Sequence, residues 1–259
     1  MTTRLVRVLT LAGNTVREAV RNRVLYTLVF FAVALIGTGV LLSTLSYVEQ
    51  ERILQDVGLA AIRLFGVAIA IFVGVGLIHR EVDRRTIYTI LSKPVSRTEF
   101  LLGKYLGLVA TLWLQVAIMA AAFAVVSLMA GAPLGAGHAA AIGLIAVELA
   151  LVVAIATLFS AFTTPMLASL FTAGLFVVGS LSRDLRELGV HSGSHVARQV
   201  LEGLYRVLPD LESFNLSIQA VHGLPIAATD VWLPVFYAAG YSAWVLLLAV
   251  VIFERRDFR

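Results

Sequence analysis

The chain has no cysteine and little charge, and each absence excludes a class of protein. None of its 259 residues is cysteine, which rules out disulfides, cysteine-based zinc sites, thiolate nucleophiles and cysteine-ligated clusters. Charged residues make up only 14% of the chain and hydrophobic residues 59%, and the mean hydropathy is +0.92. A soluble chain of this length needs far more polar surface. The composition therefore indicates an integral membrane protein.

Six apolar stretches are long enough to cross roughly 30 Å of hydrocarbon as helices that rise about 1.5 Å per residue. The expected spans are residues 24–43, 57–78, 105–129, 139–160, 166–182 and 231–253. The polar connections that remain are 44–56, 79–104, 130–138, 160–165 and an outer loop at 183–230. We therefore expect one all-α transmembrane domain over residues 1–259. Short helices in the outer loop, at 196–207 and after Pro209, are expected to cover the outer end of the helix bundle.

The basic residues indicate the orientation of these spans. With a cytoplasmic N-terminus, most of the 20 lysines and arginines fall in segments 1–23, 79–104 and 254–259. The positive-inside rule then places both termini in the cytoplasm, which an even number of spans requires. The net charge of +4 thus reflects orientation, and we expect no nucleic-acid partner. Only Lys93 and Lys104 are lysines, and the excess of Arg, Ala, Leu and Val fits a GC-rich bacterial genome. We therefore expect the chain in a bacterial cytoplasmic (inner) membrane.

Residues 4–23 are expected to form an amphipathic helix rather than a signal peptide, because charges interrupt the segment throughout. The polar side recurs at helical spacing at Arg4, Arg7, Asn14, Arg17, Glu18 and Arg21. The apolar side holds Leu5, Leu9, Ala12, Val16 and Ala19. Such a helix lies in the membrane interface with its arginines toward anionic headgroups. The alternative is a soluble tail that happens to be helical.

The charged segment 79–104 contains a short predicted helix and a sharp turn. Residues 81–92 have helical character, with apolar Val82, Ile87, Ile90 and Leu91 among charges. Pro94 ends this helix, because proline disfavours helix at the preceding residue. Ser96 and Glu99 then match a capping box at the start of the helix that re-enters the membrane. The segment is either a simple connection held at the headgroups or a docking element for a soluble partner.

At these residues the chain resembles the ABC-2 type permeases. The resemblance is carried by Glu81-Val-Asp-Arg-Arg-Thr-Ile87, Leu91-Ser-Lys-Pro-Val-Ser-Arg97 and Gly103-Lys104. It is closest to the branch typified by the permease of the copper-processing system for nitrous oxide reductase. Matching stretches at 158–165, 209–215 and 255–258 extend the resemblance through nearly the whole chain.

The resemblance implies a six-helix domain that pairs with a second copy of the permease and docks onto two copies of an ATPase subunit. Residues 81–92 would be the coupling helix, 160–165 a second contact and 4–23 a connecting helix. The residues implied in coupling to the ATPase are Glu81, Arg84, Arg85, Thr86, Ile87, Ile90 and Leu91, and Pro94, Ser96 and Glu99 form the turn and cap. The resemblance leaves room for a periplasmic accessory protein.

Nucleotide is expected on the partner rather than on this chain. The phosphate-binding pattern G-x-x-x-x-G-K-[ST] is missing, because Gly103-Lys104 is followed by Tyr105 and lacks the earlier glycine. ATP and Mg would therefore be bound by the partner subunit. We expect no cofactor and no catalytic residue in this chain.

Glu148 is the one acidic residue deep in an expected span, where an unpaired charge costs roughly 2.5–3.5 kcal/mol. Gln115 on the third span is a plausible hydrogen-bond partner, and Arg63, near the outer end of the second span, is expected to snorkel toward water. Glu148 either makes a structural bond between helices or lies on a translocation path. Its replacement by Gln is expected to be tolerated for folding.

Two histidines in the outer loop are candidates for a metal site. His191 and His195 are four residues apart, but Gly193 and two serines between them disfavour a rigid helix, and we expect no metal site.

An intramembrane enzyme lacks support, since H-E-x-x-H, G-x-S-x-G and paired membrane aspartates are missing. A secondary transporter would rest on Glu148 alone. A structural anchor without transport would share the docking helix. The sequence therefore favours the permease subunit of an ATP-driven transporter.

Overall fold

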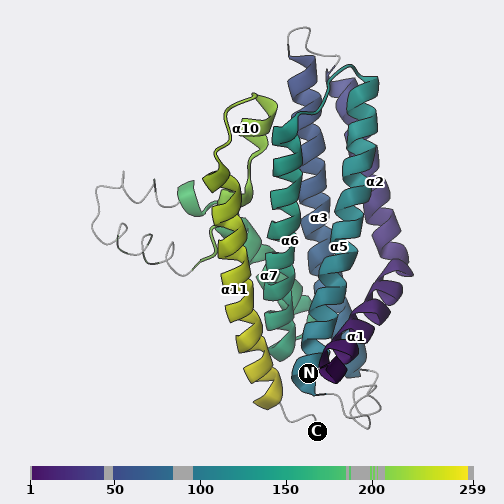
Figure 1. The fold of residues 1–259 in the computed structure, drawn as a ribbon, viewed down its shortest axis with the longest axis vertical. Coiled ribbons are helices and arrows are strands. Elements are labelled where there is room, and N and C mark those ends of the chain that lie inside the picture. Colours follow the sequence, from purple (N-terminus) through teal and green to yellow (C-terminus); the bar gives the residue numbers. More distant parts are fainter. Residues whose placement is uncertain are drawn as a thin grey trace.

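The computed structural model describes residues 2–43, 49–83, 96–184 and 208–255, together with positions 187, 199, 201 and 203. Within these residues the fold is a bundle of helices with no strand. The helices are α1 (Thr2–Val20), α2 (Arg23–Ser43), α3 (Gln50–Asp83), α5 (Arg97–Met129), α6 (Ala136–Phe162), α7 (Pro165–Ser180), η1 (Glu212–Phe214), α10 (Ser217–Val221) and α11 (Ala228–Arg255). They run mostly along the long axis of the molecule, and α1 lies at the same end as the last turns of α11 (Figure 1).

Five of the described helices are long and apolar enough to cross a membrane, namely α2, α3, α5, α6 and α11. They match five of the six expected spans. The remaining expected span, the fifth at 166–182, corresponds to α7, an apolar helix of only 16 residues. Thr164 and Pro165 start α7, with proline at a first-turn position where its missing N–H costs nothing. The chain is thus a multi-pass all-α membrane protein, and the expected count of six full-length spans is not confirmed.

The helix that contains the expected second span, 57–78, extends beyond it at both ends. Helix α3 begins at Gln50 inside the expected loop 44–56, where Glu51 adds a favourable negative charge to its first turn. It then continues without a break to Asp83. Glu81, the first residue of the predicted coupling helix, therefore lies in the last turn of α3. The other predicted coupling residues, Arg84, Arg85, Thr86, Ile87, Ile90 and Leu91, lie outside the described residues, as does Pro94.

Helix α6 occupies the middle of the bundle. It packs against α3, α5, α7 and α11, and α10 and η1 also contact it. Side chains along its length, such as Leu149 and Val153, are fully buried. Helices α2 and α11 lie on opposite sides of the bundle and expose much of their apolar surface (Figure 1). In a membrane protein such surface faces lipid or another apolar partner.

Candidate functional site

The helix that follows the predicted docking segment begins with the expected capping box. The N–H of Glu99 donates to the Ser96 hydroxyl oxygen at 3.1 Å, and the N–H of Ser96 donates to a Glu99 carboxylate oxygen at 3.1 Å. Two N–H groups that would otherwise lack partners are thereby satisfied. This prediction is confirmed, and it fixes the first turn of α5.

Ion pairs join α1 to the same end of α5. Glu99 also faces Arg4 and Arg7, at 3.7 and 3.8 Å. One turn further along, the Lys104 ammonium lies 3.3 Å from a Glu18 carboxylate oxygen, and the Lys104 side chain is only 5% exposed. Arg4 and Arg7, two of the arginines expected at lipid headgroups, therefore lie within ion-pair distance of a carboxylate of the protein. The expected helix over residues 4–23 is present as far as Val20, where α1 ends, and α2 begins at Arg23.

Two glycines of α5 let α1 approach its backbone closely. A Cβ atom at Gly107 would lie 2.5 Å from the Cβ atom of Thr15 and 2.6 Å from the carbonyl oxygen of Ala12. A Cβ atom at Gly103 would lie 2.6 Å from the Cβ atom of Leu11. This spacing of small residues is the one that membrane helices use for close packing. We call the glycines, together with the Glu18–Lys104 and Arg4/Arg7–Glu99 pairs, the α1–α5 clamp.

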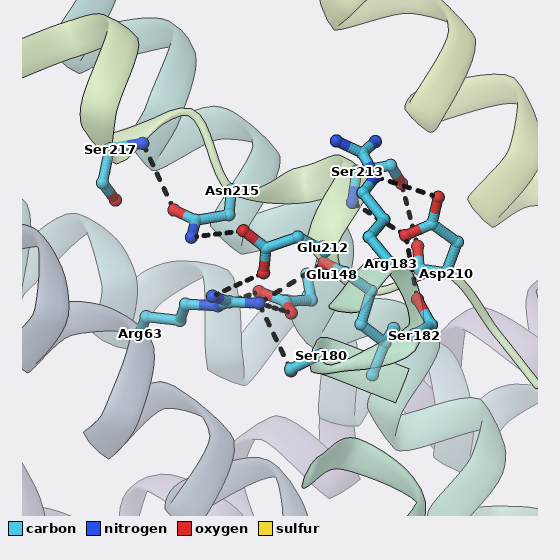
Figure 2. Close-up of polar contacts among 11 residues, drawn as sticks. Arg63, Glu148, Ser180, Ser182, Arg183, Asp210, Glu212, Ser213, Asn215 and Ser217 are labelled. Carbon is cyan, nitrogen blue, oxygen red and sulfur yellow. Dashed lines mark hydrogen bonds and ion pairs between the residues drawn. The ribbon is translucent and has the colours of Figure 1, made fainter. Parts of the chain in front are cut away.

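A second group of charges lies inside the bundle, about 18 Å from the start of α6 at roughly 1.5 Å per residue. Arg63 of α3 holds Glu148 of α6 through two hydrogen bonds, Nε to Oε2 at 3.0 Å and Nη2 to Oε1 at 2.8 Å (Figure 2). The Glu148 side chain is fully buried and that of Arg63 is 17% exposed. The planar fork of arginine matches a carboxylate in this way, which makes such pairs strong and geometrically specific.

The expected partner of Glu148 and the expected position of Arg63 are both wrong. Arg63 does not extend toward water, because Glu148 offers it a charged partner inside the bundle. Gln115 does not meet Glu148, and its buried Oε1 atom has no hydrogen-bond partner among the described residues. One signal in the sequence could have revealed the pair. The second and fourth expected spans each carry a single internal charge, and the two charges are opposite.

Arg63 also holds a segment that the sequence placed in the outer loop. Its Nη2 lies 3.3 Å from the carbonyl oxygen of Leu211 and 3.5 Å from the Ser180 hydroxyl, and its Nη1 lies 3.8 Å from a Glu212 carboxylate oxygen. Leu211 and Phe214 are fully buried, and the Leu211 N–H donates to the carbonyl of Gly179. Residues 209–216 therefore enter the bundle as an inserted segment between α7 and α11.

The polar groups of the inserted segment are satisfied within the protein. Asp210 accepts hydrogen bonds from the Ser182 hydroxyl and the Ser213 N–H, and its own N–H donates to the Tyr237 hydroxyl. The Asn215 side chain donates to Glu212 (Figure 2). Irregular backbone is tolerated at membrane depth only where protein or water supplies its partners. The expected short helices after Pro209 are present as η1 and α10, whereas most of 196–207 lies outside the described residues.

The chain matches a known protein family over nearly its whole length. The model of the family described as ABC-2 family transporter protein matches residues 9–258. The chain belongs to this family. No curated protein matches it in direct sequence comparison. The matched region covers Arg63, Glu148, the inserted segment and the whole α1–α5 clamp except Arg4 and Arg7, so these features lie inside the ABC-2 domain.

Metal binding gains no support from the described part of this ABC-2 protein. Among those residues no group of three or more His, Asp or Glu side chains is placed to hold a metal ion. His191 and His195 lie outside the described residues. The described His138 ring instead accepts a hydrogen bond from the Gly135 N–H, which closes the start of α6.

The Arg63 pair changes what we expect of Glu148→Gln. The amide removes one charge but still offers an oxygen to Arg63, and Arg63 keeps Glu212 and the Leu211 carbonyl as partners. We therefore expect the variant to reach the membrane but to unfold at a lower temperature than the wild type in detergent. Thermal unfolding followed by size-exclusion chromatography measures this, with Glu49→Gln, on an exposed surface pair, as the matched control. Equal unfolding temperatures for the wild type and Glu148→Gln would contradict the prediction.

Proposed function

We propose that the chain is the permease subunit of an ATP-binding-cassette transporter and that a separate ATPase subunit docks on residues 81–92. The observation that carries the proposal is the ABC-2 family match over nearly the whole chain. The structure adds a physical reason for the position of the docking segment. Helix α3 ends at Asp83 and the capped helix α5 begins at Arg97, so the proposed docking segment lies between two long helices in the sequence.

The proposed coupling follows from what these two helices contact. Closure of two ATPase subunits on ATP and Mg would displace the docking segment. Helix α5 would pass the displacement to α1 through the clamp, because the two helices pack as one unit. Helix α3 would pass it to α6 and to the inserted segment, because Arg63 holds both. Under this proposal the chain is a non-catalytic subunit that converts the partner's movement into a change of helix packing.

The assembly we propose has two permease copies and two ATPase subunits in a bacterial cytoplasmic membrane, with both permease termini in the cytoplasm. The exposed apolar faces of α2 and α11 leave room for the second copy beside lipid. The finer placement in the branch of the nitrous oxide reductase copper-processing system also remains a proposal. It rests on the residue patterns at 81–97, 158–165 and 209–215, and a periplasmic accessory protein belongs to the same proposal.

The Arg63 pair favours this function over a secondary transporter. An ion-coupled transporter needs a carboxylate near the midplane that can take up and release its ion. Glu148 is fully buried and both of its oxygens accept hydrogen bonds from Arg63. It is therefore committed to a structural pair. Transport that persists without any ATPase would instead support a secondary transporter.

The docking role is tested by placing charges on the apolar side of the segment. We expect Ile87→Asp combined with Leu91→Asp to abolish co-purification of the ATPase, because two carboxylates would have to be buried without partners in the interface. The matched control is Ile218→Asp with Leu224→Asp, two exposed apolar positions in the expected outer loop 183–230. Both variants should insert in the membrane. Unchanged ATPase binding by Ile87→Asp/Leu91→Asp would refute docking at this segment.

A further inference from the structure

A narrow apolar groove lies where α1 meets α2, against α5. Its volume is about 280 Å³, and its walls are almost entirely apolar. The lining side chains include Val20 of α1, Tyr26 and Val29 of α2, and Leu114, Gln115 and Ile118 of α5. Tyr26, Leu114 and Ile118 are exposed beside it. The groove therefore opens on the outer surface of helices that are expected to cross the membrane, where the surrounding medium is lipid.

Gln115 is the one feature of this groove that apolar packing does not explain. Its side chain is only 7% exposed, and its Oε1 atom has no hydrogen-bond partner among the described residues. Of the other polar side chains in the lining, Tyr26 is exposed, and the Thr111 hydroxyl donates to the Gly107 carbonyl at 2.8 Å. A buried amide without a partner is costly, and such groups in proteins usually meet one. Because Gln115 lines the groove, its side chain is the polar group there that we expect a bound molecule to contact.

Positive charge gathers beside the groove. Arg17, Arg21 and Arg23 are exposed on the last turn of α1 and at its junction with α2, next to the lining residues Val20 and Leu25. The nearest acid in this stretch, Glu18, is paired with Lys104. Arginines at the edge of a membrane-spanning segment attract anionic lipid headgroups. A molecule that has an apolar chain in the groove would carry its headgroup toward these arginines.

We propose that this groove binds one anionic phospholipid. Its acyl chain lies between α2 and α5, and its phosphate faces the arginines of the α1–α2 junction. The Gln115 carboxamide can present either its NH₂ group or its oxygen, so it donates to a lipid ester carbonyl or accepts from a headgroup hydroxyl. The site is separate from the docking segment and does not depend on the proposed coupling. It would support the α1–α2 junction from the membrane side.

Native mass spectrometry of the purified chain with phosphatidylglycerol and phosphatidylcholine tests this. We expect the wild type to retain phosphatidylglycerol preferentially. Val29→Trp, which fills the groove, should lower its occupancy about tenfold, the change that loss of one good contact produces in a binding constant. Gln115→Leu should lower it as well. The matched control is Phe30→Trp, because Phe30 is 67% exposed and does not line the groove, and it should bind like the wild type.

The charge of the lipid is tested separately. Arg21→Gln with Arg23→Gln should abolish the preference for phosphatidylglycerol over phosphatidylcholine while the folded protein still retains lipid. Equal retention of phosphatidylglycerol by the wild type and Val29→Trp would overturn the proposal. So would a wild type without preference for the anionic lipid. A change of Val29→Trp from dimer to monomer at unaltered lipid occupancy would assign the groove to a second copy of the chain and would equally overturn it.

Discussion

Arg63→Met is expected to destabilise the protein by about 3–5 kcal/mol, the cost of removing one partner from a buried ion pair. Its loss leaves the fully buried Glu148 without its two hydrogen-bond donors. It also leaves the Leu211 carbonyl without its Arg63 contact. We therefore expect little folded protein in membranes at 37 °C and a much lower unfolding temperature in detergent. Membrane yield and thermal unfolding by size-exclusion chromatography measure both.

The double variant Arg63→Met/Glu148→Met is the decisive control for this prediction. Replacing both partners of a buried pair by apolar side chains of similar volume is often nearly neutral, so most of the lost stability should return. Arg52→Met, which breaks the exposed Glu49–Arg52 pair, should have almost no effect, as is usual for surface pairs. If Arg63→Met alone unfolds like the wild type, the cluster contributes no stability. If the double variant is as unstable as Arg63→Met, the loss of stability comes from disturbed packing and not from the unpaired charge of Glu148.

Gly107→Ala is expected to force α1 away from α5. The new methyl group would lie 2.5 Å from the Cβ atom of Thr15 and 2.6 Å from a backbone oxygen that cannot rotate away. Overpacking of this kind costs about 1–3 kcal/mol. Because the chain has no cysteine, Thr15→Cys can report on the contact. Thr15 is fully buried in the wild type, so thiol labelling of Thr15→Cys should be slow alone and several-fold faster when combined with Gly107→Ala.

Gly143→Ala supplies the matched control for the clamp. A Cβ atom at this position of α6 meets nothing within 4 Å, and alanine is the better helix former. It should leave the labelling of Thr15→Cys unchanged. ATPase activity of the assembled transporter should lose its dependence on the permease in Gly107→Ala but not in Gly143→Ala. Slow labelling in the presence of Gly107→Ala would show that α1 stays in place and that the clamp does not rely on this glycine.

Local features were predictable from the sequence because they depend on neighbouring residues. The capping box of Ser96 and Glu99 is such a feature, since its donors and acceptors lie within three positions of one another. The apolar runs likewise located α2, α3, α5, α6 and α11. Ends of helices were less predictable. Helix α3 starts at Gln50 inside a polar stretch that we expected to be a loop. A negative charge in the first turn, here Glu51, stabilises a helix, so a polar stretch can also be the start of one.

Contacts between helices could not be predicted, since they depend on which faces meet. Gln115 and Arg63 were both available to Glu148, and only the packing of α3 against α6 decides for Arg63. The inserted segment is a similar case. Asp210 and Glu212 look like solvated loop residues in the sequence, yet Asp210 bonds to Tyr237 of α11 and Glu212 lies 3.8 Å from Arg63 of α3. Polarity alone could not distinguish these two situations.

Affinity purification of the tagged chain in mild detergent, with the co-purifying proteins identified by mass spectrometry, tests the central claim most directly. The account predicts a stoichiometric subunit that carries a G-x-x-x-x-G-K-[ST] phosphate-binding loop and whose ATPase activity responds to the permease. A preparation that contains no such ATPase, even after gentle crosslinking before lysis, would contradict the claim that this ABC-2 protein is the permease subunit of an ATP-driven transporter.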